Sequence, residues 1–251
     1  MSEPPLTGQL DQALAALKQA KYVVALTGAG ISVDSGIPAF RGSQGLWERY
    51  DPQEYAHIES FCRAPARVWR MLSEMLAVVF AAEPNAAHRA LAEMEADGRL
   101  QCVITQNVDG LHQAAGSRKV VEFHGNTRQL VCLTCDYRRQ LTGLDGLEVP
   151  PRCPDCGAIL KPDVVFFGEQ IPPGAQQSAQ AAAAHADLML VIGTSAQVYP
   201  SADLPRVTRH HGGQVIEINL EPTALTGGIA GLSIMASATE VLPVLAAGLK
   251  S

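Results

Sequence analysis

The sequence predicts an α/β protein with a Rossmann-like parallel sheet, helices on both faces of that sheet, and a small inserted zinc-ribbon and helical domain. Three observations lead to this prediction. Short apolar runs of strand length alternate with helical stretches along the chain. The first apolar run ends in a glycine-rich loop, which is typical of a nucleotide-binding unit. Two Cys-x-x-Cys pairs then interrupt the alternation, which indicates a separate module.

Five continuous apolar runs are predicted as strands, because parallel strands buried on both faces lack polar alternation. They are 22–27, 102–105, 120–123, 187–192 and 214–218. Amphipathic or alanine-rich stretches between them predict helices, one of them with Asn85 as its N-cap. These stretches are 11–20, 65–82, 85–97 and 175–186. Residues 44–59 contain glycine, proline and many polar residues, so we expect a loop there.

Composition excludes several classes of protein. Of the 251 residues, 47% are hydrophobic and 18% are charged, which rules out a wholly disordered chain. The net charge of −6 argues against broad binding to nucleic acid or to anionic membranes. The N-terminus does not resemble a secretory signal, and no apolar run reaches the roughly 18 residues that span a bilayer. We therefore expect a cytoplasmic monomer that contacts neither nucleic acid nor membrane.

Four of the six cysteines form the two pairs, Cys132 with Cys135 and Cys153 with Cys156, and 17 residues separate the pairs. Thiolates at this spacing on two tight turns can complete a tetrahedron around one Zn²⁺. Four protein ligands leave no open position, so the zinc is expected to be structural. Two disulfides are the competing interpretation, and a reducing compartment disfavours them.

The glycine loop alone does not identify the nucleotide chemistry. Gly28 and Gly30 match the start of a dinucleotide fingerprint, but Val33 occupies the third glycine position. Glu48 and Asp51 lie at the distance of the ribose-binding acid, yet no strand precedes them. The loop also lacks the Gly-Lys-Ser/Thr of a Walker motif. The pattern favours a dinucleotide and disfavours a hydride-transferring dehydrogenase.

Several further motifs, taken in order, resemble the sirtuins, which are NAD-dependent protein deacylases. The resemblance is to the bacterial type, runs from about residue 22 to residue 242, and depends on the order of short segments that are individually weak signals. The segments are 28–32, 35–38, 40–41, 105–112, 123–125, the cysteine pairs, 165–169, 193–195 and 218–221. The resemblance implies one NAD-binding catalytic domain over 1–251. A small domain made of 43–84 and 128–162 would interrupt it.

The resemblance also implies a reaction. The acyl oxygen of a modified lysine attacks the nicotinamide ribose of NAD⁺, nicotinamide leaves, and the acyl group departs on ADP-ribose. His124 would be the general base, since an imidazole titrates near neutrality. Asn107 and Asp109, two residues apart after a strand, would bind the nicotinamide carboxamide and its ribose. Asp109 also suits the N-cap of a short helix.

The implied NAD⁺ contacts come from several loops at strand ends. They are Gly28, Ala29, Gly30, Ser32, Ile37, Phe40, Arg41, Gln106, Asn107, Asp109, His124, Gly193, Thr194, Ser195, Asn219 and Glu221. Backbone N–H groups of residues 28–32 would face the diphosphate, Arg41 would orient it, and Phe40 would shield the reacting ribose carbon. Ser195, Asn219 and Glu221 would hold the adenosine half.

The implied partner is an acyl-lysine protein or peptide, which adds as a strand between two segments of the chain. Its contacts would be Val165, Phe167, Gly168 and Val198. A plain core strand over 165–168 is the alternative interpretation, and one of its two phenylalanines is expected to point into the core.

Acyl preference follows from two positions in the helix after the cofactor loop. Sirtuins that prefer succinyl- or malonyl-lysine carry a Tyr-x-x-Arg pair there, whereas this chain has Leu72 and Met75. A buried carboxylate without a cationic partner is strongly disfavoured, so we expect acetyl or longer apolar acyl groups. A slip of one turn in this alignment would bring Arg70 to the pocket instead. Ala39 departs from the Asp or Thr that sirtuins often have.

Three alternatives remain open from the sequence. ADP-ribosyl transfer to a protein would use the same cofactor chemistry. A zinc-ribbon module that binds a partner beside an inactive nucleotide domain belongs to a different class, and the presence of His124, Asn107, Asp109 and Arg41 argues against it. A dehydrogenase is the third, disfavoured by Val33.

Overall fold

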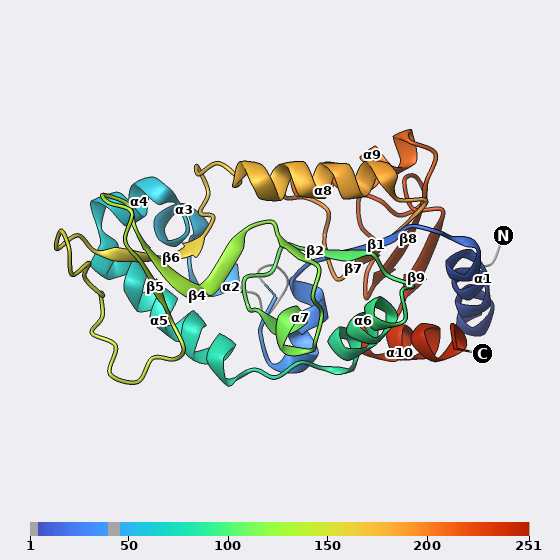
Figure 1. Cartoon of the computed structure of the whole chain (residues 1–251), viewed down its shortest axis with the longest axis horizontal. Helices are drawn as coiled ribbons and strands as arrows, with labels where there is room; N and C mark the ends of the chain where they lie inside the picture. Colours follow the sequence, from blue (N-terminus) through green and yellow to red (C-terminus); the bar gives the residue numbers. More distant parts are fainter. Residues whose placement is uncertain (1–4, 40–45, 251) are drawn as a thin grey trace.

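The computed structural model describes residues 5–39 and 46–250. A six-stranded sheet runs through the larger part of the molecule in the order β3-β2-β1-β7-β8-β9, and all of its strand pairs are parallel (Figure 1). Its strands are β1 (Val23–Thr27), β2 (Cys102–Thr105), β3 (Val120–Glu122), β7 (Leu188–Ile192), β8 (Gln214–Asn219) and β9 (Leu232–Met235). The five predicted strands are therefore confirmed, and β9 is an addition to them.

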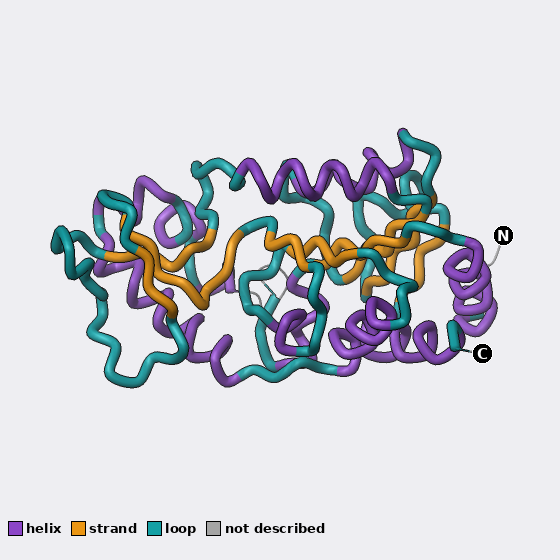
Figure 2. Tube along the Cα trace, in the orientation of Figure 1, coloured by secondary structure: helices purple, strands orange, loops and turns teal. Residues whose placement is uncertain are grey.

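Helices cover both faces of this sheet, as Figure 2 shows for the band of strands between two helical layers. One layer contains α1 (Leu6–Gln19), α6 (Ala86–Ala96) and α10 (Ala238–Gly248). The other contains α8 (Pro173–His185) and α9 (Leu204–His210). Within the described residues, no helix is both long enough and apolar enough to cross a membrane.

Strand β1 explains why the predicted strands are continuous apolar runs. Val23 and Ala25 pack into the cluster beneath α1, α6 and α10, whereas Val24 and Leu26 pack into the cluster beneath α8 and α9. Alternate side chains of a strand point to opposite faces, and here both faces are covered. All five residues of β1 are consequently buried.

The chain order of the strands reverses at the centre of the sheet. From β1 the chain proceeds outward through β2 and β3, and it later returns to β7 on the other side of β1 before continuing through β8 and β9. The connections after β1 and β7 therefore lead to helices on opposite faces of the sheet, to α6 after β1 and to α9 after β7. In open parallel sheets this switch point is where ligands bind.

A second, three-stranded antiparallel sheet lies beyond β3, in the order β5-β4-β6. Its strands are β4 (Gly125–Cys132), β5 (Arg138–Gln140) and β6 (Leu160–Val164). Helix α5 (Pro65–Ala81) packs on this sheet through Trp69, whose Nε1–H donates to the Leu160 carbonyl oxygen at 2.8 Å. This region has its own apolar cluster, separate from the two clusters of the larger sheet.

The expectation of a loop over 44–59 is wrong for its described part. Three short helices fill this stretch and its continuation: α2 (Leu46–Arg49), α3 (Pro52–Tyr55) and α4 (Ile58–Arg63). Asp51 caps α3 by accepting a hydrogen bond from the Gln53 N–H at 2.9 Å. Pro52 then occupies the first helical position, where a missing N–H does no harm. The proline that suggested a loop is thus a helix-start residue.

Candidate active site

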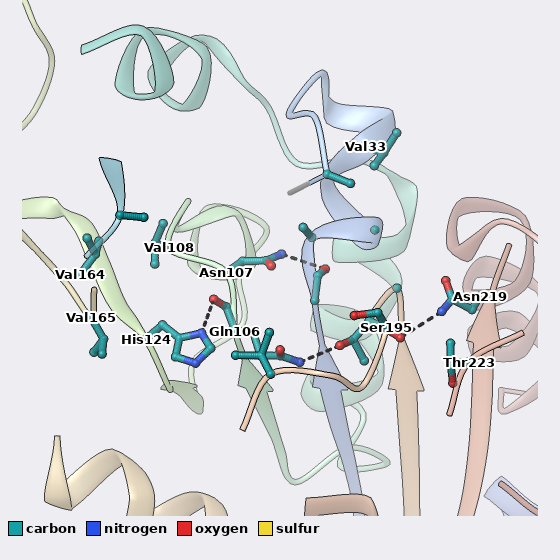
Figure 3. Close-up of a pocket in the computed structure, with 18 of the residues that line it drawn as sticks. Val33, Gln106, Asn107, Val108, His124, Val164, Val165, Ser195, Asn219 and Thr223 are labelled. Carbon is teal, nitrogen blue, oxygen red and sulfur yellow. Dashed lines mark hydrogen bonds between the residues drawn. The ribbon is translucent and has the colours of Figure 1, made fainter. Parts of the chain in front are cut away.

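A cleft of about 640 Å³ lies at the carboxyl ends of the central strands, between the large sheet and the small three-stranded module. One wall is the 3₁₀ helix η1 (Ala29–Ser35) with the turns after β2, β7 and β8. The opposite wall is the segment after β6 together with α5. Figure 3 shows side chains from both walls directed toward this cleft.

Most of the sequence-predicted residues line the cleft. They are Gly28, Ala29, Gly30, Gln106, Asn107, His124, Val165, Phe167, Gly168, Gly193, Thr194, Ser195, Val198, Asn219 and Glu221. Ser32, Ile37 and Asp109 do not line it. Phe40 and Arg41 lie outside the described residues. Sequence reasoning missed Met71, Val108 and Thr223, which line the cleft and carry no distinctive chemical signal.

The glycine loop approaches the turn after β7 at backbone contact distance. A Cβ built on Gly30 would lie 2.7 Å from the Gly193 Cα, and one on Gly28 would lie 2.7 Å from the Thr194 Cβ. The Gly28 N–H donates to the Ile192 carbonyl, and the Gly30 N–H donates to the Gly193 carbonyl. These two N–H groups therefore tie the loop to the sheet, in contrast to the expectation that they face a diphosphate. The glycines are needed for close packing.

Replacing Gly30 with alanine is expected to destabilise the protein by about 1–3 kcal/mol, the usual cost of overpacking a well-packed site. The same change should weaken NAD⁺ binding, because the loop would move away from Gly193. The measurements are thermal unfolding and calorimetric titration with NAD⁺. Gly174→Ala is the matched control, since a Cβ there meets nothing within 4 Å and the residue lies in α8, where alanine is favoured; it should lower neither stability nor NAD⁺ affinity. If Gly30→Ala and Gly174→Ala had the same stability and the same affinity for NAD⁺, Gly30 would not be needed for close packing against Gly193.

Asn107 is held by a chain of buried hydrogen bonds. Its Nδ2 donates to the Gly28 carbonyl and to Ser32 Oγ, both at 3.1 Å, and Ser32 Oγ donates to Asp109 Oδ2 at 2.8 Å. The other oxygen of Asp109 accepts from the N–H of Leu111, the first residue of α7 (Leu111–Ala114), whose N-cap is Gly110 and not Asp109. Burial raises the pKa of Asp109, and these donors oppose the rise. Asp109 thus lies behind the cleft wall and acts through Ser32 on Asn107.

The Oδ1 atom of Asn107 is buried and has no hydrogen-bond partner in the described part of the chain. Buried polar atoms are nearly always paired, so an unpaired one in a cleft wall indicates a ligand donor. A carboxamide NH₂ group is such a donor. Asn107 therefore offers a free acceptor to a ligand that carries an N–H or O–H donor.

His124 lies at the junction of the two sheets, between β3 and β4. Its Nδ1 is 3.0 Å from the Gln106 carbonyl oxygen, and because a carbonyl only accepts, Nδ1 carries the proton (Figure 3). The neutral ring therefore has its lone pair on Nε2. Burial lowers the pKa of His124, and the bond to Gln106 partly opposes this effect. Such an imidazole is neutral and basic at physiological pH.

Two further histidines are buried beneath the Asn107 wall. The rings of His88 and His112 are 4.9 Å apart, edge to face. His88 Nε2 lies 3.5 Å from Ser32 Oγ, and His112 Nε2 lies 2.9 Å from Thr27 Oγ1. Burial lowers the pKa of His88 to about 4 and that of His112 to about 3, so both rings are neutral. His112 thus packs in the interior, and nothing in the sequence indicates that His88 lies near Asn107.

The four paired cysteines converge at one point of the small module, where their Sγ atoms all lie within 4.8 Å of one another. The Sγ–Sγ distances are 3.5 Å for Cys132–Cys156, 3.6 Å for Cys135–Cys153 and 3.8 Å for Cys135–Cys156. A tetrahedral zinc with Zn–S bonds of about 2.3 Å requires Sγ–Sγ distances of about 3.8 Å. The donor set and its spacing therefore fit one structural Zn²⁺.

The end of the cleft beside α5 is apolar. Leu72 and Met75 line it, as the sequence predicted, and so do Val164 and Val108, which Figure 3 shows close to each other. Arg70 is exposed and is not part of the lining. Among the described residues, the cleft lining contains no lysine or arginine. Of the two neighbouring phenylalanines, Phe166 is 5% exposed and Phe167 is 39% exposed, which confirms that one of them points into the core.

This fold and cleft define an α/β protein of the dinucleotide-binding class with a four-cysteine module beside the cleft. Residues 28–200 match the Sir2 family. The chain is 47% identical over 242 residues to the NAD-dependent protein deacylase of Thermococcus kodakarensis, with 94% of each chain covered. The chain belongs to the Sir2 family, the sirtuins.

Solved structures agree with this assignment. A Sir2 homolog in complex with NAD has a TM-score of 0.90 at 43% identity, covering 96% of this chain and 93% of that one. A Sir2 complex with a deacetylated p53 peptide and 3′-O-acetyl ADP-ribose has a TM-score of 0.89 at 37% identity, covering 94% of this chain and 96% of that one.

Proposed function

We propose that this protein is an NAD-dependent protein-lysine deacylase that produces nicotinamide, the free lysine and O-acyl-ADP-ribose. One observation carries the proposal: a single cleft holds an imidazole with its lone pair on Nε2 and an amide with an unpaired Oδ1. These are the groups of His124 and Asn107. A base for a ribose hydroxyl and an acceptor for a carboxamide are what this reaction requires of the protein.

The residues of the large-sheet wall fit the NAD⁺ molecule. Asn107 would accept a hydrogen bond from the nicotinamide carboxamide. Gln106 Nε2 donates to Thr194 Oγ1 at 3.0 Å, and Asn219 Nδ2 donates to the Thr194 carbonyl at 3.0 Å, so three strand-end turns are joined at the ribose and adenosine side (Figure 3). NAD⁺, when bound, supplies the electrophilic ribose carbon and the leaving nicotinamide.

His124 would take the proton from a ribose hydroxyl. Its Nδ1 bond to the Gln106 carbonyl fixes the ring orientation and the tautomer, and it stabilises the imidazolium that forms. The hydroxyl oxygen can then attack the imidate carbon formed from the acyl group. The proton held by His124 can return to the lysine amine as it leaves that adduct, and addition of one water then frees one ribose oxygen as a hydroxyl and leaves the acyl group on the other.

The acyl-lysine peptide would lie between residues 165–168 and Val198, which line the cleft from its two sides. Val165 is tied to the base, because its N–H donates to the His124 carbonyl at 2.8 Å. Gly168 has a φ of +84°, and a Cβ there would lie 2.7 Å from His57 Cε1, so glycine is required beside the peptide. We call residues 164–168 the peptide shelf. A segment of this kind favours recognition of the peptide through its backbone.

Acetyl-lysine is expected to be removed at least about 100-fold faster than succinyl-lysine, because an unpaired carboxylate in the apolar end would lose several kcal/mol of solvation. The measurement is NAD⁺-dependent loss of mass from two peptides that differ only in the acyl group. The double variant Leu72→Tyr/Met75→Arg should shift the preference toward succinyl-lysine. A wild-type preference for succinyl-lysine would contradict the apolar assignment.

The same experiment separates the other functions. ADP-ribosyl transfer would add mass to the peptide instead of removing it. A dehydrogenase would produce NADH, with its absorbance. A partner-binding module with an inactive nucleotide domain would consume no NAD⁺. Any of these outcomes without deacylation would overturn the proposal.

Three further features belong to this proposal. Segments 43–84 and 128–162 would act as one small domain, and the apolar cluster shared by α5, β4 and β6 supports this. None of the six cysteines, all of which lie in the described part of the chain, forms a disulfide, and this supports a location in the cytoplasm. We also propose a monomer that binds neither nucleic acid nor membrane, as its net charge of −6 favours.

A further inference from the structure

A largely buried ion pair lies at the proposed peptide shelf, residues 164–168: Lys161 is buried outside the cleft lining, whereas Glu169 lines the same cleft. The side chains of Lys161 and Glu169 are 4% and 22% exposed, and Lys161 Nζ lies 2.9 Å from Glu169 Oε2. Both residues border the segment 164–168, which lines the cleft. A charged pair this deep is retained only where its hydrogen bonds are satisfied, since the removal of both charges from water is costly.

The pair binds the backbone of the shelf at two successive places. Lys161 Nζ donates to the Val164 carbonyl at 2.5 Å, and Glu169 Oε2 accepts from the Phe166 N–H at 2.8 Å. The ammonium also lies 4.6 Å from the centroid of the Phe166 ring, which is a cation–π distance. Lys161 and Glu169 thus hold the peptide groups on either side of Val165.

Val165 is the residue that faces the cleft between these two bonds. Its own N–H donates to the His124 carbonyl. Three hydrogen bonds therefore set the orientation of Val165 relative to the base: those of its two flanking peptide groups to Lys161 and Glu169, and that of its own N–H to the His124 carbonyl. Loss of either charge would leave the other buried and unpaired, so the segment would rearrange to solvate it.

We propose that Lys161 and Glu169 are positioning residues for the acyl-lysine substrate, because their ion pair fixes the backbone of residues 164–168 on which the peptide would lie. This inference rests on the proposed function, since it assumes that this segment is the peptide shelf. According to this inference, the charges of Lys161 and Glu169 affect the affinity for the peptide and leave the affinity for NAD⁺ unchanged.

The test uses Lys161→Met and Glu169→Gln, which keep side-chain length and remove one charge each. Binding of a fluorescent acetyl-lysine peptide is measured by anisotropy, and NAD⁺ binding by calorimetry. We expect the peptide Kd of Lys161→Met to rise at least about tenfold, or about 1.4 kcal/mol. NAD⁺ affinity should stay within about twofold, because neither residue is among the expected NAD⁺ contacts and the pair holds the backbone of residues 164–166. Lys161→Arg keeps the charge and should bind the peptide within about threefold of wild type.

Arg138→Gln is the matched control. Arg138 pairs with Asp163 at 2.7 Å on the same small sheet, but this pair is exposed, at 58% and 41%. Exposed pairs contribute about 0–1 kcal/mol, so the control should bind peptide and NAD⁺ as wild type does. If Lys161→Met does not fold, the peptide and NAD⁺ Kd values of Glu169→Gln provide the test.

Two results would overturn the inference. One is a peptide Kd within about twofold of wild type in both charge-removing variants. The other is a parallel loss of peptide and NAD⁺ affinity, which would indicate general unfolding. A wild-type protein that binds the peptide but does not deacylate it would refute the proposed function. The peptide Kd values of the variants would still decide whether the Lys161–Glu169 ion pair positions the peptide. A wild-type protein that neither binds nor deacylates the peptide would refute both.

Discussion

His124→Ala is expected to lower the rate of NAD⁺-dependent deacylation by about 10²–10⁴-fold, the usual contribution of a positioned general base. The imidazole is held by Gln106 and carries its lone pair on Nε2, so alanine removes the base and leaves the surrounding wall in place. The measurement is kcat on an acetyl-lysine peptide, read as loss of mass.

The pH dependence of the wild-type rate provides a second readout. The neutral imidazole is the active form, so the rate should rise with pH through the pKa of His124. Because burial lowers this pKa, the midpoint of the rise should lie below the ordinary histidine value of about 6.5. His185→Ala is the control variant, since His185 is on α8, away from the cleft lining, and should leave the rate unchanged. A midpoint above the ordinary value, or an active His124→Ala variant, would remove His124 from the mechanism.

Removal of zinc is expected to unfold the small module and to abolish deacylation. Structural zinc contributes about 10–16 kcal/mol in small zinc-binding peptides, so the four-cysteine turns should not hold their arrangement without it. The apolar cluster of the module includes Cys132 and Cys153 together with Trp69 of α5, so the loss would spread to the acyl end of the cleft. Thermal unfolding and activity, before and after a chelator, measure this effect.

Cys156→Ser should reproduce the effect of the chelator, whereas Cys62→Ser should not. Cys62 is an exposed thiol outside the cluster, which makes it the matched control. Metal analysis of the purified protein should give about one zinc per chain. Deacylation that survives complete loss of zinc would disprove the structural role.

The sequence predicts the centre of the fold well and its edges poorly. Strands such as β1 are continuous apolar runs because both of their faces are buried, and this signal is local. Strand β9 is four residues long, includes Ser233 and is mostly half-buried at the sheet edge, so its run is too short and too polar to recognise. The helices α2 to α4 are four to six residues long, and helices this short depend on tertiary packing for their stability.

The candidate site required more than residue chemistry. His124 is one of seven histidines, and only the resemblance to sirtuins distinguished it from the others. The sequence could not show that the carboxylate of Asp109 faces Ser32 and away from the cleft, since a two-residue spacing fixes no direction in a turn. Nor could it show that Lys161 and Glu169, eight residues apart, meet, because this contact requires the chain to turn back after β6.

The helix that forms the wall of the acyl end of the cleft does not hold the proposed base. Leu72 and Met75 belong to α5, which is anchored through Trp69 to the Leu160 carbonyl, whereas His124 is held by Gln106 and Val165. Substitutions on one face of α5 can therefore alter which acyl chains fit without moving the base. Evolution can therefore change the acyl-group specificity of this enzyme through substitutions in a single helix while the catalytic chemistry stays constant. Protein engineering can use the same route.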